Sequence, residues 1–283
     1  MAQKLRKEKE LNQIKKSTNV LFNIIFIILS ALCIFPIVFV FSISISSETS
    51  IQKNGYQLIP QELSAAAYQF LWNERGTILH ATFISILVTA LGIILSVLLT
   101  TTMGYVVSRN TYKLKSFYTW VIFIPMIFNG GMLAGYVVNT NILHLRNSIW
   151  ALILPLAVSP FNIVICKTFF KTQIILPISK PIIATIALFA AFGYWNDWFQ
   201  ASLYISDKNL QTLQSMLNNI QNNIEYIANN PYGGLSLQQY KASMPTESVR
   251  MAIAIIIVVP IACVYPFFQK YFISGLTIGS VKG

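Results

Sequence analysis

The fold is organised around a short polar connection, Lys167-Thr168-Phe169-Phe170-Lys171-Thr172-Gln173, which continues as Ile174-Ile175-Leu176-Pro177-Ile178-Ser179-Lys180-Pro181. Apolar segments lie on both sides of this connection, although it contains three lysines. Its two prolines predict helix boundaries, because proline lacks an N–H group and disfavours a helical conformation in the residue before it. We therefore interpret the connection as a cytoplasmic cuff between two membrane-spanning helices.

The composition is that of a membrane protein. Hydrophobic residues make up 55% of the 283 residues and charged residues only 10%, whereas soluble domains contain roughly 25% charged residues. The apolar segments are close to the ~20 residues that cross a bilayer as a helix. They lack the alternating period of membrane strands. The sequence thus predicts an all-α membrane protein.

We predict six transmembrane helices, the first of which follows a basic tail at residues 1–19. The first apolar run is too long for the apolar region of a signal peptide, so we expect an uncleaved span. A core at 78–272 would include an outer loop at 206–248, and 273–283 would form a C-terminal tail. An outer polar segment is expected at 46–77. The six predicted spans are residues 20–45, 78–107, 117–138, 149–168, 181–204 and 249–268.

The basic residues predict the orientation of these spans. If the N-terminus lies in the cytoplasm and the spans alternate, 14 of the 20 Lys and Arg residues fall on the cytoplasmic side. Cytoplasmic loops of membrane proteins carry such an excess. Both termini are therefore expected inside the cell, and the net charge of +11 does not require a nucleic-acid partner.

The motifs of common enzymes are absent from the sequence. It contains no phosphate-binding GxxxxGK[ST] loop, no HExxH and no GxSxG, which are signatures of nucleotide binding, zinc proteases and serine hydrolases. Cys33, Cys166 and Cys263 form no CxxC pair, so we expect neither a disulfide framework nor a metal site. We expect a non-catalytic protein without a cofactor.

The fifth predicted span contains a polar and aromatic cluster, Tyr194-Trp195-Asn196-Asp197-Trp198. Aromatic faces beside amide and carboxylate groups suit a sugar, which has an apolar face and a rim of hydroxyls. An interfacial aromatic belt with an asparagine that joins helices is the alternative. Asp197 is the one carboxylate inside a predicted span, and that alternative explains it less well.

Two further stretches have open interpretations. Asn129-Gly130-Gly131 follows Pro125 and predicts a kink, which would line either a translocation path or a close helix contact. In the outer segment, residues 211–227 show apolar residues at spacings of three and four, which predicts an amphipathic helix. That helix would offer a surface to an extracellular partner or lie on the membrane.

With these residues in place, the sequence resembles the MalG-type (LplC/YtcP-like) permease subunits of carbohydrate ABC transporters. The resemblance covers nearly the whole chain. The matching runs are Phe128-Asn129-Gly130-Gly131, Trp150-Ala151-Leu152-Ile153-Leu154-Pro155, Ser159-Pro160-Phe161-Asn162, Leu176-Pro177-Ile178-Ser179-Lys180-Pro181, Tyr194-Trp195-Asn196-Asp197-Trp198, Pro245-Thr246-Glu247-Ser248-Val249-Arg250-Met251-Ala252, Tyr265-Pro266-Phe267-Phe268-Gln269-Lys270-Tyr271-Phe272 and the tail from Gly275 to Gly283.

The resemblance implies a type I ABC importer permease fold in a bacterial cytoplasmic membrane. It also implies a second permease subunit, separate ATPase subunits, an extracellular solute-binding protein and a carbohydrate, presumed by family to be an oligosaccharide, moved by alternating access. The substrate path would include Asn129, Tyr194, Trp195, Asn196, Asp197 and Trp198. The cuff residues expected to face the ATPase are Lys167, Phe170, Lys171, Pro177, Lys180 and Pro181.

The chain departs from the family at the cuff. The family continues there into an amphipathic coupling helix with a Glu-Ala-Ala signature, which docks into the ATPase. Here Lys171-Thr172-Gln173 passes almost directly into Ile174-Ile175-Leu176-Pro177, so roughly two dozen residues that the family pattern leads us to expect are missing. Two alternatives therefore stay open, an uncoupled or assembly-only permease and, less favoured, a secondary transporter.

Overall fold

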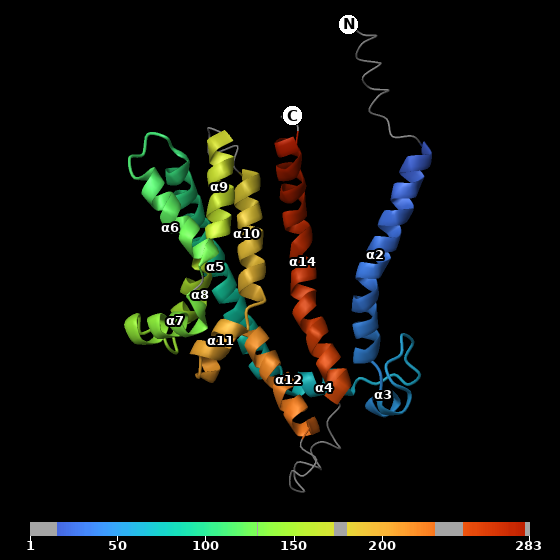
Figure 1. Ribbon diagram of the computed structural model, residues 1–283. Helices are drawn as coiled ribbons and strands as arrows, with labels where there is room; N and C mark the ends of the chain where they lie inside the picture. The colour runs from blue at the N-terminus through green and yellow to red at the C-terminus, as the bar shows by residue number, and fades with distance from the viewer. Residues whose placement is uncertain (1–15, 129, 173–179, 230–245, 281–283) are drawn as a thin grey trace. The chain divides into compact units, whose positions relative to one another are not determined.

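The computed structural model describes residues 16–128, 130–172, 180–229 and 246–280, and these are almost entirely helical (Figure 1). Asn129 and Pro177 lie outside the described residues. The chain forms two compact units, which fall within 1–68 with 245–255 and within 69–244 with 256–283. Each unit is considered by itself.

The first unit begins with a long apolar helix, α2 (Lys16–Ser44). Its 29 residues extend about 44 Å at 1.5 Å per residue, which exceeds the ~30 Å hydrocarbon core of a bilayer. Only Ser42, Ile43 and Ser44 of this helix are buried. Most of the remaining apolar side chains are exposed along its length, as suits contact with lipid or with another membrane helix.

A compact polar segment, which includes α3, follows α2. The Ser47 hydroxyl caps α3 (Glu48–Asn54) by accepting from the Ser50 amide. An antiparallel bridge joins Ser46 to Leu63, and the Ser47 amide donates to the Glu62 carbonyl at 2.9 Å. The segment after α2 is therefore folded back on itself rather than extended.

The same polar segment caps α14 (Thr246–Ser280). The cap is the carboxylate of Glu48, which lies 199 residues before Glu247 in the sequence. Glu48 accepts hydrogen bonds from the amides of Glu247 and Ser248 at 3.2 and 3.3 Å, and from the Ser248 hydroxyl at 3.2 Å. A negative charge at this position also favours the positive end of the helix dipole. The Tyr56 hydroxyl donates to Glu247 at 2.8 Å, and this bond raises the pKa of Tyr56.

In the second unit, α5 (Arg75–Ser108) is the central helix. It packs against α8 (Ile149–Ala157), α9 (Pro160–Thr172) and α10 (Lys180–Trp195), with α6 (Lys115–Ile127) and α12 (Leu213–Asn229) also in contact with it (Figure 1). Its buried face carries a small residue at every fourth position, namely Gly92, Ser96, Thr100, Gly104 and Ser108. Small residues at this spacing let membrane helices approach closely.

Two glycines of this stripe are required by packing. A Cβ added at Gly92 would lie 2.4 Å from the Tyr194 ring, and one added at Gly104 would lie 2.6 Å from the Cβ of Cys166. The first contact joins α5 to α10 and the second joins α5 to α9. The positions of these two helices on α5 therefore depend on the absence of a side chain.

Several predicted spans are interrupted. The predicted break at Gly130-Gly131 is confirmed, because α6 ends at Ile127 and α7 (Gly131–Val137) begins at a glycine with φ +79°. A π-helical turn, η1 (Val138–Ile142), follows. α8 and α9 meet at a bend of 47°. The helix predicted for 181–204 is divided into α10 and α11 (Phe199–Tyr204).

The amphipathic helix predicted in the outer segment is confirmed as α12. It follows α11 and the short turn η3 (Lys208–Leu210) in the chain. A short helix, α4 (Ala66–Asn73), precedes α5. Three described helices are long and apolar enough to cross a membrane, and the bent pair α8–α9 would be a fourth. α6 and the Ile182–Trp195 part of α10 are shorter apolar helices. Each predicted span thus contains an apolar helix, while the number of crossings stays a prediction.

Candidate functional site

A pocket of about 400 Å³ lies where α5, α8, α9 and α10 meet. Aromatic and aliphatic groups make up most of its wall, including the rings of Phe161, Phe189 and Tyr194. The polar groups are Ser96 of α5, Ser159 at the bend and Asn162 of α9. Apolar walls with a few polar groups are typical of pockets for small molecules.

Two of these polar side chains have no partner within the described residues. Asn162 is only 8% exposed and Ser96 only 2%, yet no hydrogen bond joins either side chain to another described residue. Neither side chain is among the fully buried polar groups left without a partner, so their polar atoms keep some accessible surface. The Asn162 amide and the Ser96 hydroxyl are thus free to bind a polar molecule in the pocket.

The bend between α8 and α9 creates this arrangement. Pro160 cannot donate a backbone hydrogen bond, which favours a break before it and suits the first position of α9. The Ser159 hydroxyl then caps α9 by accepting a hydrogen bond from the backbone N–H of Asn162 at 3.4 Å. The side chain of Asn162, one turn into α9, is placed at the pocket.

Tyr194 and Trp195, both predicted to lie on the substrate path, are mainly involved in packing. The Tyr194 hydroxyl donates to the Ile153 carbonyl at 2.8 Å, and the side chain is 4% exposed. Its ring still forms part of the pocket wall. The Trp195 indole donates to the Ile257 carbonyl at 3.3 Å and lines a separate apolar cavity.

The other three residues of the predicted cluster form the break between α10 and α11. Asn196 and Trp198 are exposed, and the Trp198 ring lies edge-on to Phe199 at 5.9 Å. Asp197 accepts from the Gln200 amide at 3.3 Å and so begins α11. The structure does not gather the five residues at one point, and only Tyr194 touches the pocket.

The sequence and the fold of this chain are similar to those of known proteins. No family model matches the chain. The chain is 31% identical over 280 residues to the polygalacturonan/rhamnogalacturonan transport system permease protein YtcP of Bacillus subtilis, covering 91% of this chain and 96% of that protein. This chain belongs to the carbohydrate ABC transporter permeases.

Further likenesses agree with this family. The permease is 34% identical over 274 residues to Protein LplC of Bacillus subtilis, with 89% of this chain and 90% of that protein covered. It also superimposes with a TM-score of 0.75 and 22% identity on a chain from a bacterial ABC transporter involved in the import of the acidic polysaccharide alginate. That likeness covers 92% of the permease and 99% of the other chain, and it shows the fold.

The cuff of the permease is described only in part. Phe170 is 4% exposed and lies edge-on to Tyr105 at 5.9 Å, so its ring belongs to the helix core. Lys167 reaches Thr119 of α6 at 3.3 Å, and Lys171 is exposed. Lys180 and Pro181 begin α10, and their side chains are outside the description. Lys167 and Lys171 are thus the cuff side chains seen to be accessible.

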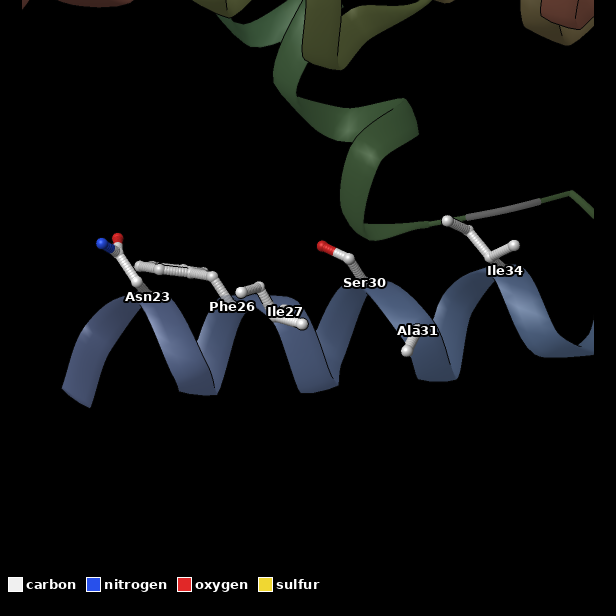
Figure 2. Close-up of a pocket in the computed structure, with 6 residues that line it drawn as sticks. All are labelled: Asn23, Phe26, Ile27, Ser30, Ala31 and Ile34. Atoms are coloured by element: carbon white, nitrogen blue, oxygen red, sulfur yellow. The ribbon is translucent and has the colours of Figure 1, made fainter. Parts of the chain in front are cut away.

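A second hollow of the permease lies on α2 and is shown in Figure 2. It measures about 570 Å³. All six lining residues belong to this one helix, among them the polar residues Asn23 and Ser30 on an otherwise apolar surface. A hollow on one face of a membrane helix suits another helix better than a solute, because polar side chains can join helices in the membrane.

Among the described residues, no group of three His, Cys, Asp or Glu side chains could hold a metal ion. The pocket residues Ser96 and Asn162 were not singled out by sequence reasoning as ligands. Ser96 could have been found from the small residues at every fourth position of α5. Asn162 stands in a run that matched the family, but its exposure to the pocket depends on the bend.

Proposed function

We propose that this permease is the membrane subunit of an ATP-driven, binding-protein-dependent importer for an oligosaccharide, and that the pocket at Asn162 contacts the sugar. The observation that carries this proposal is the unpaired amide of Asn162 beside the unpaired hydroxyl of Ser96 in an aromatic-walled pocket. Sugar hydroxyls donate and accept hydrogen bonds, whereas sugar C–H faces pack on aromatic rings. The relatives include permease proteins of polygalacturonan/rhamnogalacturonan and arabinooligosaccharide transport systems.

The proposed topology has six spans with both termini in the cytoplasm. The positive charges of the loops support it, and it places the cuff on the ATPase side. The hollow on α2 would receive a helix of the second permease subunit. The amide-rich, exposed part of α12, with Asn219, Asn222 and Asn223, would face the extracellular solute-binding protein. Chemistry on ATP would belong to separate ATPase chains.

The lengths of the alignments support the proposal that this chain lacks a segment that its relatives have. The alignment with LplC runs over 274 positions, whereas 89% of 283 residues is about 252, so about 22 positions have no counterpart in this chain. The alignment with YtcP leads to a similar value, since 91% of 283 is about 258 against 280 positions. Both values agree in size with the roughly two dozen residues that we predict to be missing at the cuff. This favours a second candidate function, an uncoupled or assembly-only subunit.

The test of sugar binding replaces the unpaired amide. Asn162→Ala removes no hydrogen bond of the described protein, so we expect the purified transporter to melt within about 1 °C of wild type or higher. Sugar uptake by proteoliposomes that contain the partner permease and ATPase should show a KM raised by roughly fivefold to tenfold, the effect of one lost hydrogen bond to a buried ligand. Asn209→Ala, at an exposed asparagine, is the matched control.

Two results would contradict the proposal separately. An unchanged KM in Asn162→Ala would show that the pocket does not contact the sugar, even if uptake by wild type depends on ATP. Wild-type protein that forms a complex with its partner permease, yet neither retains the ATPase nor drives uptake, would favour the uncoupled subunit. Restoring a coupling segment of the relatives between Gln173 and Ile174 should then restore ATPase binding.

A further inference from the structure

Another cavity, of about 270 Å³, lies between α5 and α6, at the end of these helices that the basic loop at 109–115 connects. Its inner wall is apolar, with Met103, Val106, Val107 and Ile122. Tyr112 and Tyr118 lie at its loop end, with ring centroids 5.9 Å apart. The cavity thus has an apolar interior and a polar, aromatic mouth.

Lysines of α6 and α9 lie near this mouth, although none of them lines the cavity. Lys115 lies three residues before Tyr118 on α6, so the two share one helix face. The Lys167 ammonium of α9 reaches Thr119 on the same face at 3.3 Å. The Thr119 hydroxyl in turn donates to the Lys115 carbonyl at 2.8 Å, and Lys171 lies one turn after Lys167 on α9. Three lysines from two helices therefore lie close to the contact between α6 and α9.

These cations have no carboxylate beside them in the described part of the chain. The described acidic residues are Glu48, Glu62, Glu74, Asp197, Asp207, Glu225 and Glu247, and none lies in α6, in α9 or in the loop between α5 and α6. The one ion pair among the described residues joins Arg250 to Glu247. A cluster of like charges without a counter-charge favours an anionic ligand.

We propose that this site binds an anionic glycerophospholipid, with its phosphate between Lys115 and Lys167 and one acyl chain in the cavity between α5 and α6. Basic pockets between membrane helices on the cytoplasmic side bind anionic headgroups. The inference rests on the proposed function only in placing this end of α5 and α6 at the inner membrane surface. It adds a ligand that differs from the transported sugar.

The side chains around the cluster favour a lipid over a docked ATPase. Leu114, which precedes α6, and Phe117 and Trp120 of α6 are 53%, 62% and 59% exposed. Exposed apolar and tryptophan side chains next to cations are typical of the membrane interface. A water-filled contact with a soluble protein would leave these apolar side chains in an aqueous gap. In a bound lipid, the phosphate headgroup would contact the lysines, and the acyl chains would cover the apolar side chains beside them.

The test uses the full chain in nanodiscs and measures its retention of phosphatidylglycerol and phosphatidylcholine by native mass spectrometry. We expect phosphatidylglycerol to be retained preferentially. Lys115→Gln with Lys167→Gln should weaken that retention by roughly 30-fold, about fivefold for each lysine near the membrane surface. Lys53→Gln with Lys208→Gln removes the same charge at exposed positions outside the cluster and should leave retention unchanged.

A second variant tests the cavity without a change of charge. Val106→Trp, at a position 40% exposed on the cavity wall, should fill the cavity and lower phosphatidylglycerol retention while the thermal melting of the chain is kept. Equal retention of both lipids, or full retention by the double lysine variant, would overturn the proposal. So would a double variant that keeps its lipid but loses the ATPase, since the cations would then serve protein docking. None of these readouts requires sugar transport.

Discussion

Gly92→Ala is the sharpest test of the helix packing that builds the pocket at Asn162. The added Cβ would lie 2.4 Å from Cε2 and Cζ of Tyr194, where ordinary contact begins at 3.4 Å. The ring would have to move by about 1 Å, since carbon atoms pack at about 3.5–4.0 Å. Such a shift lengthens the 2.8 Å bond from Tyr194 to the Ile153 carbonyl beyond hydrogen-bonding distance.

Two costs then add. Overpacking a core costs about 1–3 kcal/mol, and a buried carbonyl left without its partner costs about 1–3 kcal/mol more. We expect a loss of roughly 2–6 kcal/mol, which corresponds to a melting temperature lower by roughly 4–24 °C at about 2–4 °C per kcal/mol for a large chain. The assay is thermal melting of the purified permease in detergent, followed by size-exclusion chromatography.

The control is Gly76→Ala on the same helix, because an added Cβ there meets nothing within 4 Å. That variant should melt at or above the wild-type temperature, since alanine is the better helix former. Tyr194→Leu should in turn relieve the clash, so Gly92→Ala combined with it should lose less than the sum of the two single changes. Equal melting of Gly92→Ala and Gly76→Ala would refute the packing of α5 on α10.

Two further predictions concern capping residues. Glu48→Ala removes the carboxylate that caps α14 and should cost about 1–2 kcal/mol in thermal melting, whereas Glu74→Ala, whose side chain makes no capping bond to α5, should change it by less than about 0.5 kcal/mol; equal effects would count against the cap. Asp197→Asn keeps an oxygen that can accept from Gln200 and should retain sugar uptake, while Asp197→Ala should lose stability and uptake together. A loss of uptake in a stable Asp197→Asn protein would instead assign the charge to sugar binding.

The membrane class and the order of the helices could be predicted from the sequence, because they depend on composition and on segment length. The breaks inside apolar segments were harder to place. Asp197-Trp198-Phe199-Gln200 has the spacing of a capping box, and this local signal could have divided the fifth span at α11. It was interpreted as a sugar-binding cluster because aromatic rings flank it on both sides. The small residues at every fourth position from Gly92 to Ser108 could likewise have predicted the face of α5 that packs against other helices.

Other features could not be predicted in this way, because they depend on contacts between distant residues. Glu48 caps a helix that begins 198 residues later in the sequence, and no local pattern indicates this pairing. The exposure of the Asn162 amide depends on the 47° bend between α8 and α9. A proline predicts a break, but neither its angle nor the residue that it turns toward a neighbouring helix.

The position of the pocket relative to the cuff suggests how motion of the cuff would reach the proposed sugar site. Asn162 lies ten residues, or about 15 Å, before the end of α9, and Gly193 lies thirteen residues, or about 20 Å, after the start of α10. These two helices enter and leave the cuff, and each forms one wall of the pocket. The third wall, at Ser96, belongs to α5, which does not enter the cuff. Force applied to Lys167 or Lys171 would thus move two walls together against the third, and coupling would depend on how firmly an ATPase can hold so short a connection.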